Sequence, residues 1–223
     1  MPGAFILENV LTDAECEQFV SATEQMGYDE DAPVSLPHSF RHMENVNWLV
    51  DAGIPSTVFD RVSDVLPPAA KEVAPGAEAL GINARFRCYK YAGGDYFKFH
   101  TDGSWPGSLV VTDDADGTKK MIWDAFGGGG VAWSQLTFLL LLSDGYEGGR
   151  TLFETGGGEV VAVRTPKGGA LCFPHGGHPQ HVRHAGETVE SGLKYMIRTE
   201  LLYRRTAESD AFQHGWFRDG SGQ

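Results

Sequence analysis

The chain has 223 residues, with 18 Lys and Arg residues against 30 Asp and Glu residues, which gives a formal charge of −12. This acidic balance argues against a polyanion such as a nucleic acid as the main partner. Hydrophobic residues make up 41% of the chain and charged residues 22%, so the chain can bury a complete core and wholesale disorder is excluded.

Two helices are predicted in the N-terminal part of the chain. Thr12 can cap the first helix, Glu15 completes a capping box three residues later, and Gly27 ends the helix. The second helix is expected to begin after Gly53 and to stop at Pro67, which is followed by another proline. We expect both helices to support the rest of the fold.

From Ile82 onward the chain consists of short runs of β-forming residues separated by glycine. Glycine contributes 29 residues, nearly twice the usual share of about 7%, which predicts many turns. This pattern is typical of a sandwich or barrel. The expected strands are Arg85–Tyr91, Tyr96–His100, Gln135–Leu142, Thr151–Glu154, Val160–Arg164, Ala170–Phe173, His181–Ala185 and Tyr195–Tyr203.

No internal repeat and no Pro/Ser-rich linker divides the chain, so a single domain over residues 1–223 is the economical interpretation. Within it we expect a helical N-terminal support over residues 1–80 and a β core over residues 82–205. Residues 215–223 are expected to form a loose tail. The oligomeric state is left open by the sequence.

The segment over residues 101–133 separates the second expected strand from the third. Loops of this length in a compact domain are usually functional. The segment contains Trp105 and Trp123, and the four glycines of residues 127–130 can act as a hinge. Residues 103–133 are therefore a candidate lid.

Three cysteines, Cys16, Cys88 and Cys172, are odd in number and widely spaced. This pattern excludes a disulfide framework and a CxxC zinc site, and it favours a reducing compartment. The N-terminus lacks the basic flank and apolar run of a signal peptide. The longest apolar stretch, residues 136–142, is far shorter than the roughly 20 residues that cross a bilayer. We therefore expect a soluble cytoplasmic or otherwise intracellular protein that is not bound to a membrane.

A metal-binding pair is predicted at His100 and Asp102, where an aromatic strand ends. Residues two apart on a strand point to the same face, so the imidazole and the carboxylate can reach one point together. With a distant second histidine, they would form the facial triad of non-haem Fe(II) oxygenases, which leaves coordination positions open. Such a pair alone is more often structural.

The second histidine is expected within residues 175–184, where four histidines recur every three residues. Glycine and proline in this segment exclude a regular helix, so the four rings cannot converge on a zinc ion by helical geometry. Most of them are expected on the surface or in loops. His184 is the preferred ligand because it leads toward a strand, and His181 is the alternative.

Several motifs then occur in an order that resembles 2-oxoglutarate/Fe(II)-dependent dioxygenases, in particular the prolyl 4-hydroxylase alpha-subunit catalytic domain. The resemblance covers about residues 82–203. It implies a mainly β (α+β) protein, a double-stranded β-helix (jelly roll, cupin-like) with N-terminal supporting helices. The motifs are residues 87–96, His100-x-Asp102, residues 148–153, residues 167–173, His184-Ala185-Gly186 and Gly192-x-Lys194.

The resemblance implies that Fe(II) is bound by His100, Asp102 and His184. It also implies that Lys194, ten residues after His184, pairs with the distal carboxylate of 2-oxoglutarate, with Arg198 as an alternative or helper. An unpaired charge in a poorly hydrated pocket is costly, which is why a cation is needed there.

Two further residues match pocket residues of the same family. Tyr91 corresponds to the tyrosine that hydrogen-bonds the cosubstrate, and Thr137 to a polar residue that lines the same pocket. Two departures from the family pattern also stand out: Arg150 follows Gly148-Gly149 where the family has an acidic residue, and Glu187 replaces a small residue after Gly186.

The implied activity is hydroxylation of a C–H bond, with 2-oxoglutarate and O2 as cosubstrates, ascorbate as reductant, and release of succinate and CO2. The substrate would be a peptide, as for prolyl hydroxylases, or alternatively a free amino acid or small natural product. A non-catalytic cupin-like binding module is the alternative from another class. A nucleic-acid demethylase is disfavoured by the charge of −12, although a local basic patch remains conceivable from Arg164, Lys167, Arg183, Lys194 and Arg198.

Overall fold

The predicted capping box begins the first helix. The computed structural model describes residues 3–30, 37, 39–66, 78–113, 115–176, 178 and 180–204. At the start of α1 (Asp13–Met26), the Thr12 hydroxyl accepts the Glu15 N–H at 3.2 Å, and the Glu15 carboxylate accepts the Thr12 N–H at 2.9 Å. Gly27 caps the other end, as expected.

The second helix, α2 (Gly53–Val62), continues as a short 3-10 helix, η1 (Ser63–Val65). The expected stop at Pro67 lies outside the described residues, as does the expected tail over residues 215–223. Among the described residues, no helix combines the length and the apolar character that a membrane crossing requires.

Three strands that the sequence did not indicate accompany these helices within the helical support expected over residues 1–80. They are β1 (Phe5–Leu7), β2 (Arg41–His42) and β3 (Glu44–Leu49). Each pairs with a strand of the β core, where it satisfies backbone groups that would otherwise be open at a sheet edge. β1 and β2, with three and two residues, are too short for alternation to be recognised in the sequence.

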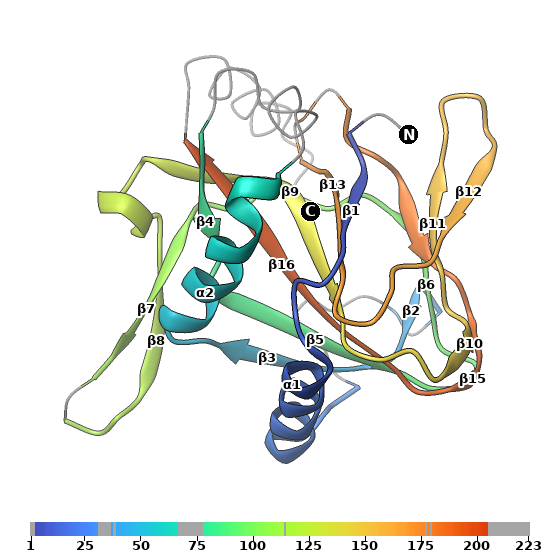
Figure 1. The fold of residues 1–223 in the computed structure, drawn as a ribbon, viewed down its shortest axis with the longest axis horizontal. Helices are drawn as coiled ribbons and strands as arrows, with labels where there is room; N and C mark the ends of the chain where they lie inside the picture. Colours follow the sequence, from blue (N-terminus) through green and yellow to red (C-terminus); the bar gives the residue numbers. More distant parts are fainter. Residues whose placement is uncertain are drawn as a thin grey trace.

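The major sheet has the strand order β1-β13-β9-β16-β5-β3, with β4 also paired to β16 (Figure 1). The long strand β16 pairs antiparallel with both β9 and β5, so it ties the sheet together. The bounds are β4 (Ala79–Ile82), β5 (Arg85–Tyr91), β9 (Ala132–Leu141), β13 (Ala170–Pro174) and β16 (Lys194–Arg204).

The minor sheet has the order β12-β11-β14-β6-β2, and β10 pairs separately with β15. The expected segment His181–Ala185 differs most from its strand, β14, which begins only at His184 because His181 belongs to a turn closed on His178. The bounds are β6 (Tyr96–His100), β10 (Tyr146–Gly148), β11 (Thr151–Glu154), β12 (Val160–Val163), β14 (His184–Gly186) and β15 (Val189–Gly192).

The side chains of β16 alternate between two apolar clusters. Tyr195 and Ile197 belong to the cluster that also holds residues of α1 and α2, whereas Met196 packs with Phe153 of the minor sheet. Because alternate strand residues point to opposite faces, Lys194 and Arg198 share the inner face with Met196. The two packed antiparallel sheets confirm the expected mainly β, jelly-roll fold.

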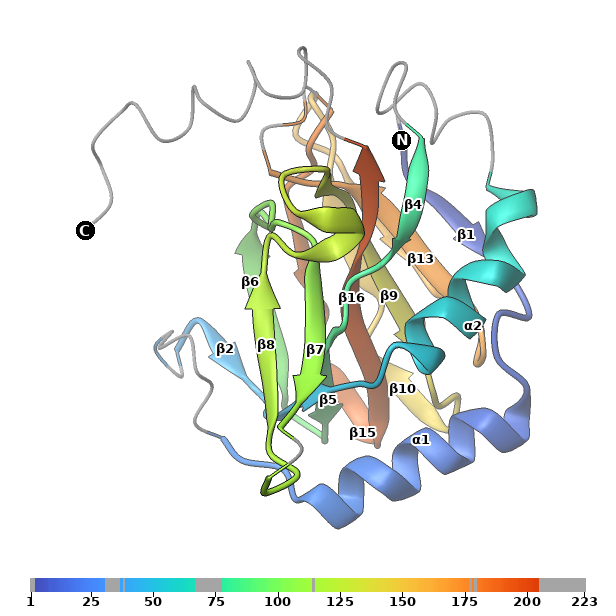
Figure 2. The same cartoon turned by 90° about the vertical axis from the view of Figure 1, so that its left-hand side faces the viewer.

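The segment expected as a lid loop contains regular structure. Strands β7 (Ser108–Thr112) and β8 (Lys119–Trp123) form a hairpin, and η2 (Phe126–Gly128) follows. The tight turn between the strands is closed by the Asp113 N–H, which donates to the Thr118 carbonyl at 2.8 Å. Figure 2 shows β7 and β8 side by side, in front of β5 and β16 in this view.

The N-terminal segment packs closely against Gly168, so we expect a substitution of this glycine to destabilise the fold. Gly168 has a φ of +73°, and a Cβ there would lie 2.3 Å from the Leu11 carbonyl oxygen. Gly158 has a similar φ of +80° but no heavy atom within 4 Å of such a Cβ. We expect Gly158→Ala to cost about 1 kcal/mol in the free energy of unfolding, and Gly168→Ala about 1–3 kcal/mol more because of the clash. Urea denaturation measures both, and equal losses would contradict the importance of this contact.

Candidate metal centre

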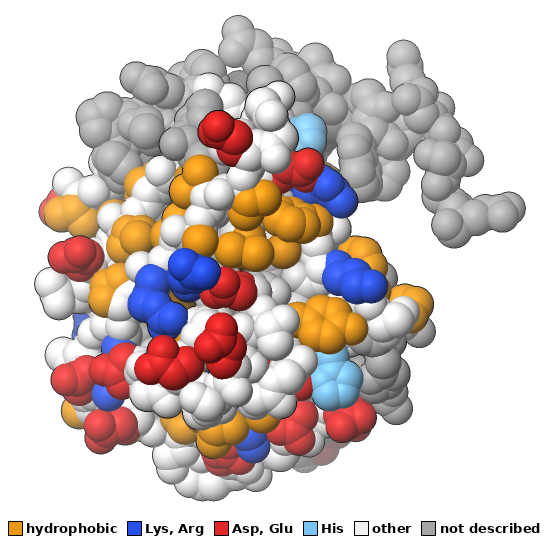
Figure 3. Space-filling view, turned by 90° about the vertical axis from the view of Figure 1, so that its right-hand side faces the viewer, with side chains coloured by type: hydrophobic (Ala, Val, Ile, Leu, Met, Phe, Trp, Pro, Cys, Tyr) orange, Lys and Arg blue, Asp and Glu red, His pale blue; other side chains and the backbone are white. Residues whose placement is uncertain are grey.

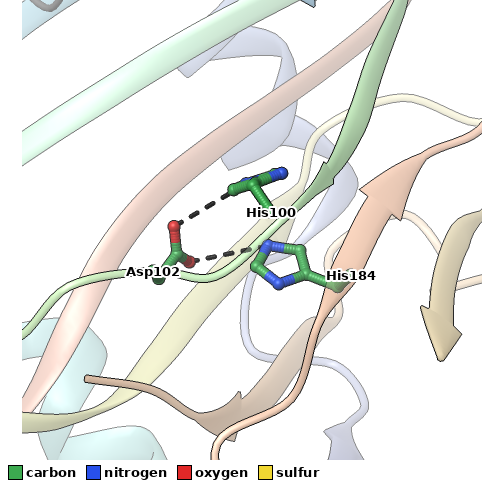
Figure 4. A group of neighbouring side chains, drawn as sticks. All are labelled: His100, Asp102 and His184. Atoms are coloured by element: carbon green, nitrogen blue, oxygen red, sulfur yellow. Dashed lines mark ion pairs between the residues drawn. The ribbon is translucent and has the colours of Figure 1, made fainter. Parts of the chain in front are cut away.

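His100 and His184 lie opposite one another on neighbouring strands of the minor sheet. They are register partners of β6 and β14, and their ring centroids are 4.2 Å apart. Asp102 lies just beyond the end of β6 and turns its carboxylate toward both rings (Figure 4). One nitrogen or oxygen atom from each of the three lies within 4.8 Å of those of the other two. The structure thus brings together the three residues that the sequence suggested as ligands.

Backbone carbonyls orient the two imidazoles. Nδ1 of His100 lies 2.8 Å from the Lys98 carbonyl oxygen, and Nδ1 of His184 lies 3.4 Å from that of Val182. Because a carbonyl only accepts, each Nδ1 carries the proton and each Nε2 keeps its lone pair. The Nε2 atoms lie 3.8 and 3.7 Å from the carboxylate oxygens of Asp102, so all lone pairs face one point.

The surroundings keep these residues in the protonation states that bind metals. Burial lowers the pKa of His184 to about 4 and also lowers the pKa of His100, so both rings are neutral. Burial alone would raise the pKa of Asp102, but the Arg198 guanidinium and the histidines hold it well below its usual range. Two neutral imidazoles and one carboxylate suit a divalent transition metal.

Arg198 fixes the Asp102 carboxylate. Its Nε and Nη2 atoms lie 3.2 Å from Oδ2 and Oδ1 of Asp102, respectively. Its Nη1 donates to Glu200 at 3.0 Å, and the residue is only 5% exposed. The guanidinium of Arg198 already binds two carboxylates. It is therefore less available to bind the cosubstrate than the sequence suggested.

A chain of hydrogen bonds supports Asp102 from the other side. Thr137 donates to Oδ2 of Asp102 at 2.7 Å, so His175 Nδ1, 2.8 Å from the Thr137 hydroxyl, must be the donor to that oxygen. His175 Nε2 then accepts from the Ser134 hydroxyl at 2.8 Å, which itself accepts the Trp105 N–H at 2.8 Å. Burial lowers the pKa of His175 to about 3, which agrees with a neutral ring.

These contacts correct two sequence expectations. Thr137 is not among the residues that line the cavity and instead holds Asp102 from within the sheet. His175 and His178 are buried, although most histidines of this segment were expected on the surface. His181 is exposed and lies outside the metal cluster, so it is not the second ligand. The one sequence signal for His175 is its place directly after the expected strand Ala170–Phe173.

A cavity opens beside the candidate metal ligands and is lined by His100 and His184. Lys194 lies in it, 4% exposed and directly opposite Tyr91 in the β16–β5 register. Its Nζ donates to the Gly149 carbonyl at 2.7 Å, and among the described residues no carboxylate lies within 4.0 Å. Burial lowers the pKa of Lys194 to about 8. The cavity is lined by Tyr89, Tyr91, Phe97, His100, Leu139, Thr151, His184, Ala185, Gly186, Lys194, Met196 and Arg198.

The two departures from the family pattern compensate one another. Arg150 donates through Nε to Glu187 at 2.7 Å and through Nη2 to the other oxygen of the same carboxylate. The hydrogen bond from Arg150 lowers the pKa of Glu187 to about 2. Neither residue lines the cavity.

The local basic patch does not form on the surface. Lys194 and Arg198 are buried, Arg183 pairs with Glu154, and Arg164 donates to a backbone carbonyl. Figure 3 shows Lys and Arg side chains lying beside Asp and Glu side chains on this face, without a continuous basic surface.

The chain of hydrogen bonds predicts that Thr137 controls metal affinity. Thr137→Val removes the donor to Asp102, and loss of such a support lowers metal affinity about 10- to 100-fold. Thr199 is the matched control, since it is also buried and its hydroxyl donates to a backbone carbonyl, that of Asn83. Titration with Co(II) should show weaker binding for Thr137→Val alone. Equal affinity of the two variants would rule out this role.

Comparison with known proteins supports the fold. No protein-family model matches the chain, and no curated protein is similar to it in sequence. Three solved structures are similar at low identity. A viral collagen prolyl hydroxylase from Paramecium bursaria Chlorella virus-1, in complex with 2OG, has 16% identity and a TM-score of 0.54 over 90% of this chain and 95% of that chain.

The second is a Pseudomonas putida prolyl-4-hydroxylase, with 14% identity and a TM-score of 0.56 over 92% of this chain and 94% of that one. The third is a Trichoplax adhaerens prolyl hydroxylase in complex with a peptide fragment of hypoxia inducible factor, with 14% identity and a TM-score of 0.58 over 96% and 87%. The resemblance to prolyl hydroxylases inferred from sequence motifs is thus confirmed at the level of the fold.

Proposed function

We propose that the protein is a non-haem Fe(II)- and 2-oxoglutarate-dependent dioxygenase that hydroxylates a C–H bond, with release of succinate and CO2. One observation carries the proposal: three metal-ligand side chains converge, and the cavity that two of them line, His100 and His184, also holds a buried lysine without a carboxylate partner among the described residues. A non-catalytic binding module has no need of this combination. The shared fold with prolyl hydroxylases supports the same conclusion.

The donor set fits Fe(II), which prefers two imidazole nitrogens and a carboxylate oxygen with open positions for other ligands. His100, Asp102 and His184 would hold the ion, and when bound it would supply the chemistry of O2 activation. Arg198 and Thr137 keep the Asp102 carboxylate ionised and in place. Second contacts of this kind tune the affinity of a metal site.

The cosubstrate would bind across the cavity. Lys194 can pair with the distal carboxylate of 2-oxoglutarate, because burial leaves this cation with a single backbone carbonyl as acceptor. Tyr91, directly opposite, brings a hydroxyl to the same end. Leu139 and Met196 line the cavity with apolar surface, which excludes water.

For the substrate, the peptide-bound Trichoplax structure supports a proline-containing peptide, and a free amino acid or small natural product is the alternative. We further propose ascorbate as the reductant. The free thiols of Cys16, Cys88 and Cys172, all buried, support action in a reducing compartment such as the cytoplasm.

The first test is succinate release from 2-oxoglutarate with Fe(II) and ascorbate, on a panel of proline-containing peptides and free amino acids. We expect turnover by the native protein and loss to the iron-free level in Asp102→Ala, because a ligand is removed. Asp60→Ala, an exposed acid on α2, is the control and should retain activity. No turnover above the Asp102→Ala level on any substrate, together with no absorption band from an iron–keto-acid complex, would refute the proposal.

The second test is the pH dependence of 2-oxoglutarate binding. Lys194 must be protonated in the free protein if it is to bind the 2-oxoglutarate carboxylate, and burial lowers the pKa of Lys194 to about 8. The affinity for 2-oxoglutarate should therefore be at its maximum below pH 8. It should fall as the pH rises above 8, by up to about tenfold per pH unit. Lys194→Arg should remove this dependence, because arginine stays charged. Calorimetry on the Mn(II)-loaded protein measures the dissociation constants. Parallel pH profiles for the two proteins would show that Lys194 is not the partner.

A further inference from the structure

A second group of cations continues the inner face of the major sheet beyond Arg198. Arg87 is the direct register partner of Arg198 across β5 and β16, and Arg85 follows two residues away on the same face. Like charges directly opposite each other destabilise a sheet. Asp102 and Glu200 neutralise the charge of Arg198, but they do not pair with Arg85 or Arg87.

Neither arginine has an acidic partner in the part of the chain that the structure describes. Nε and Nη2 of Arg85 and Nη2 of Arg87 are buried and have no hydrogen-bond acceptor. Buried donors without acceptors are rare and costly. Burial, and to a smaller extent the charge of Arg87, lower the pKa of Arg85 to about 10.

The open edge of Arg85 is one that this protein uses elsewhere for carboxylates. Arg150 binds Glu187 through Nε and Nη2, and Arg198 binds Asp102 through the same two atoms. This edge of the guanidinium matches the two oxygens of a carboxylate. The geometry of Arg85 therefore fits a carboxylate that none of the described residues supplies.

Two tryptophans cover these arginines. The Trp105 ring lies 4.8 Å from the Arg85 guanidinium and 5.4 Å from that of Arg87, and Trp123 lies 5.0 Å from Arg85. The two indoles stack on each other with centroids 5.4 Å apart. Trp123 ends β8 and is 37% exposed, so it is the ring that separates Arg85 from solvent on this side. We refer to Arg85, Arg87, Trp105 and Trp123 as the arginine–tryptophan cluster.

The cluster adjoins the metal ligands on the side away from Lys194. Arg87 is opposite Arg198, which contacts Asp102, and Trp105 follows Asp102 by three residues. Lys194 and Arg198 are four residues apart on β16, or about 13 Å along the strand. The two cationic sites therefore flank the metal centre.

We propose that the arginine–tryptophan cluster binds a carboxylate of the substrate that is hydroxylated, with Trp123 displaced as the carboxylate reaches Arg85. This inference rests on the proposed function, because it assumes that the protein hydroxylates a substrate. It narrows that substrate to molecules that carry a carboxylate. The carboxylate can belong to a free acid such as an amino acid, to a peptide C-terminus or to an acidic side chain.

The test compares probes that differ only in a carboxylate, added to protein loaded with Fe(II) and 2-oxoglutarate without O2. The free acids are L-proline, L-leucine and L-phenylalanine against their amides. The peptide probes are acetyl-Gly-Pro-Gly as acid and amide, and acetyl-Gly-Pro-Glu-amide against acetyl-Gly-Pro-Gln-amide. Ligand-observed NMR gives the dissociation constants, and tryptophan fluorescence reports movement of Trp123.

We expect at least one acid to bind roughly tenfold or more tightly than its neutral partner, and the pair that shows it identifies the source of the carboxylate. Arg85→Met and Arg87→Met should abolish this preference while the iron–keto-acid absorption band persists. Arg61→Met, whose arginine pairs with Glu15 on the surface, is the control and should keep it. In the absence of probes, the melting temperature of the Arg87→Met variant should be no lower than that of the native protein, because the substitution removes a positive charge that has no acidic partner among the described residues.

Three results would overturn the inference: no acid preferred over its neutral partner by the native protein, a preference that survives both arginine substitutions, or equal weakening of acids and neutral partners. A preference that depends on Arg85 and Arg87 in a protein lacking the iron–keto-acid band would instead uphold carboxylate binding and refute the proposed function.

Discussion

The buried pairing of Arg198 with Asp102 is the constraint on which the rest of the site depends. A carboxylate within the sandwich is stable as an anion only if a cation and further donors compensate its lost hydration. Arg198 and Thr137 supply both, from two neighbouring strands of the major sheet, while the two histidines approach from the minor sheet. The metal cluster is thus formed between the sheets, and its geometry depends on how the sheets pack.

The alternation of β16 distributes charge along this interface. Lys194, Arg198 and Glu200 all point inward at even spacing, with Met196 among them, while the residues between them pack toward the helices. The strand thereby presents Lys194, which has no carboxylate partner among the described residues, at its start, and Arg198, which two carboxylates neutralise, near its middle. This difference supports Lys194 rather than Arg198 as the proposed partner of an anion, a choice that the sequence alone left open.

Much of the site was predictable because its signals are local. The spacing of His100 and Asp102 on a strand, and the interval of ten residues from His184 to Lys194, can be recognised without a structure. The supporting roles of His175 and Ser134 could not be predicted, since they arise from contacts between β9 and the residue after β13. The strands β1 and β2 were missed because they are too short for alternation to show, and the β7–β8 hairpin was hidden by its glycine-rich and acidic surroundings.

The pairing of Arg150 with Glu187 has an evolutionary consequence. Each residue alone departs from the pattern of the family that the sequence resembles, yet together they form an ion pair whose two charges cancel. Burial and Arg164 lower the pKa of Lys194, and the charge of Glu187 partly opposes them. A lineage that replaced only one of the two residues would pass through an intermediate with an uncompensated charge, so the two positions are expected to change together.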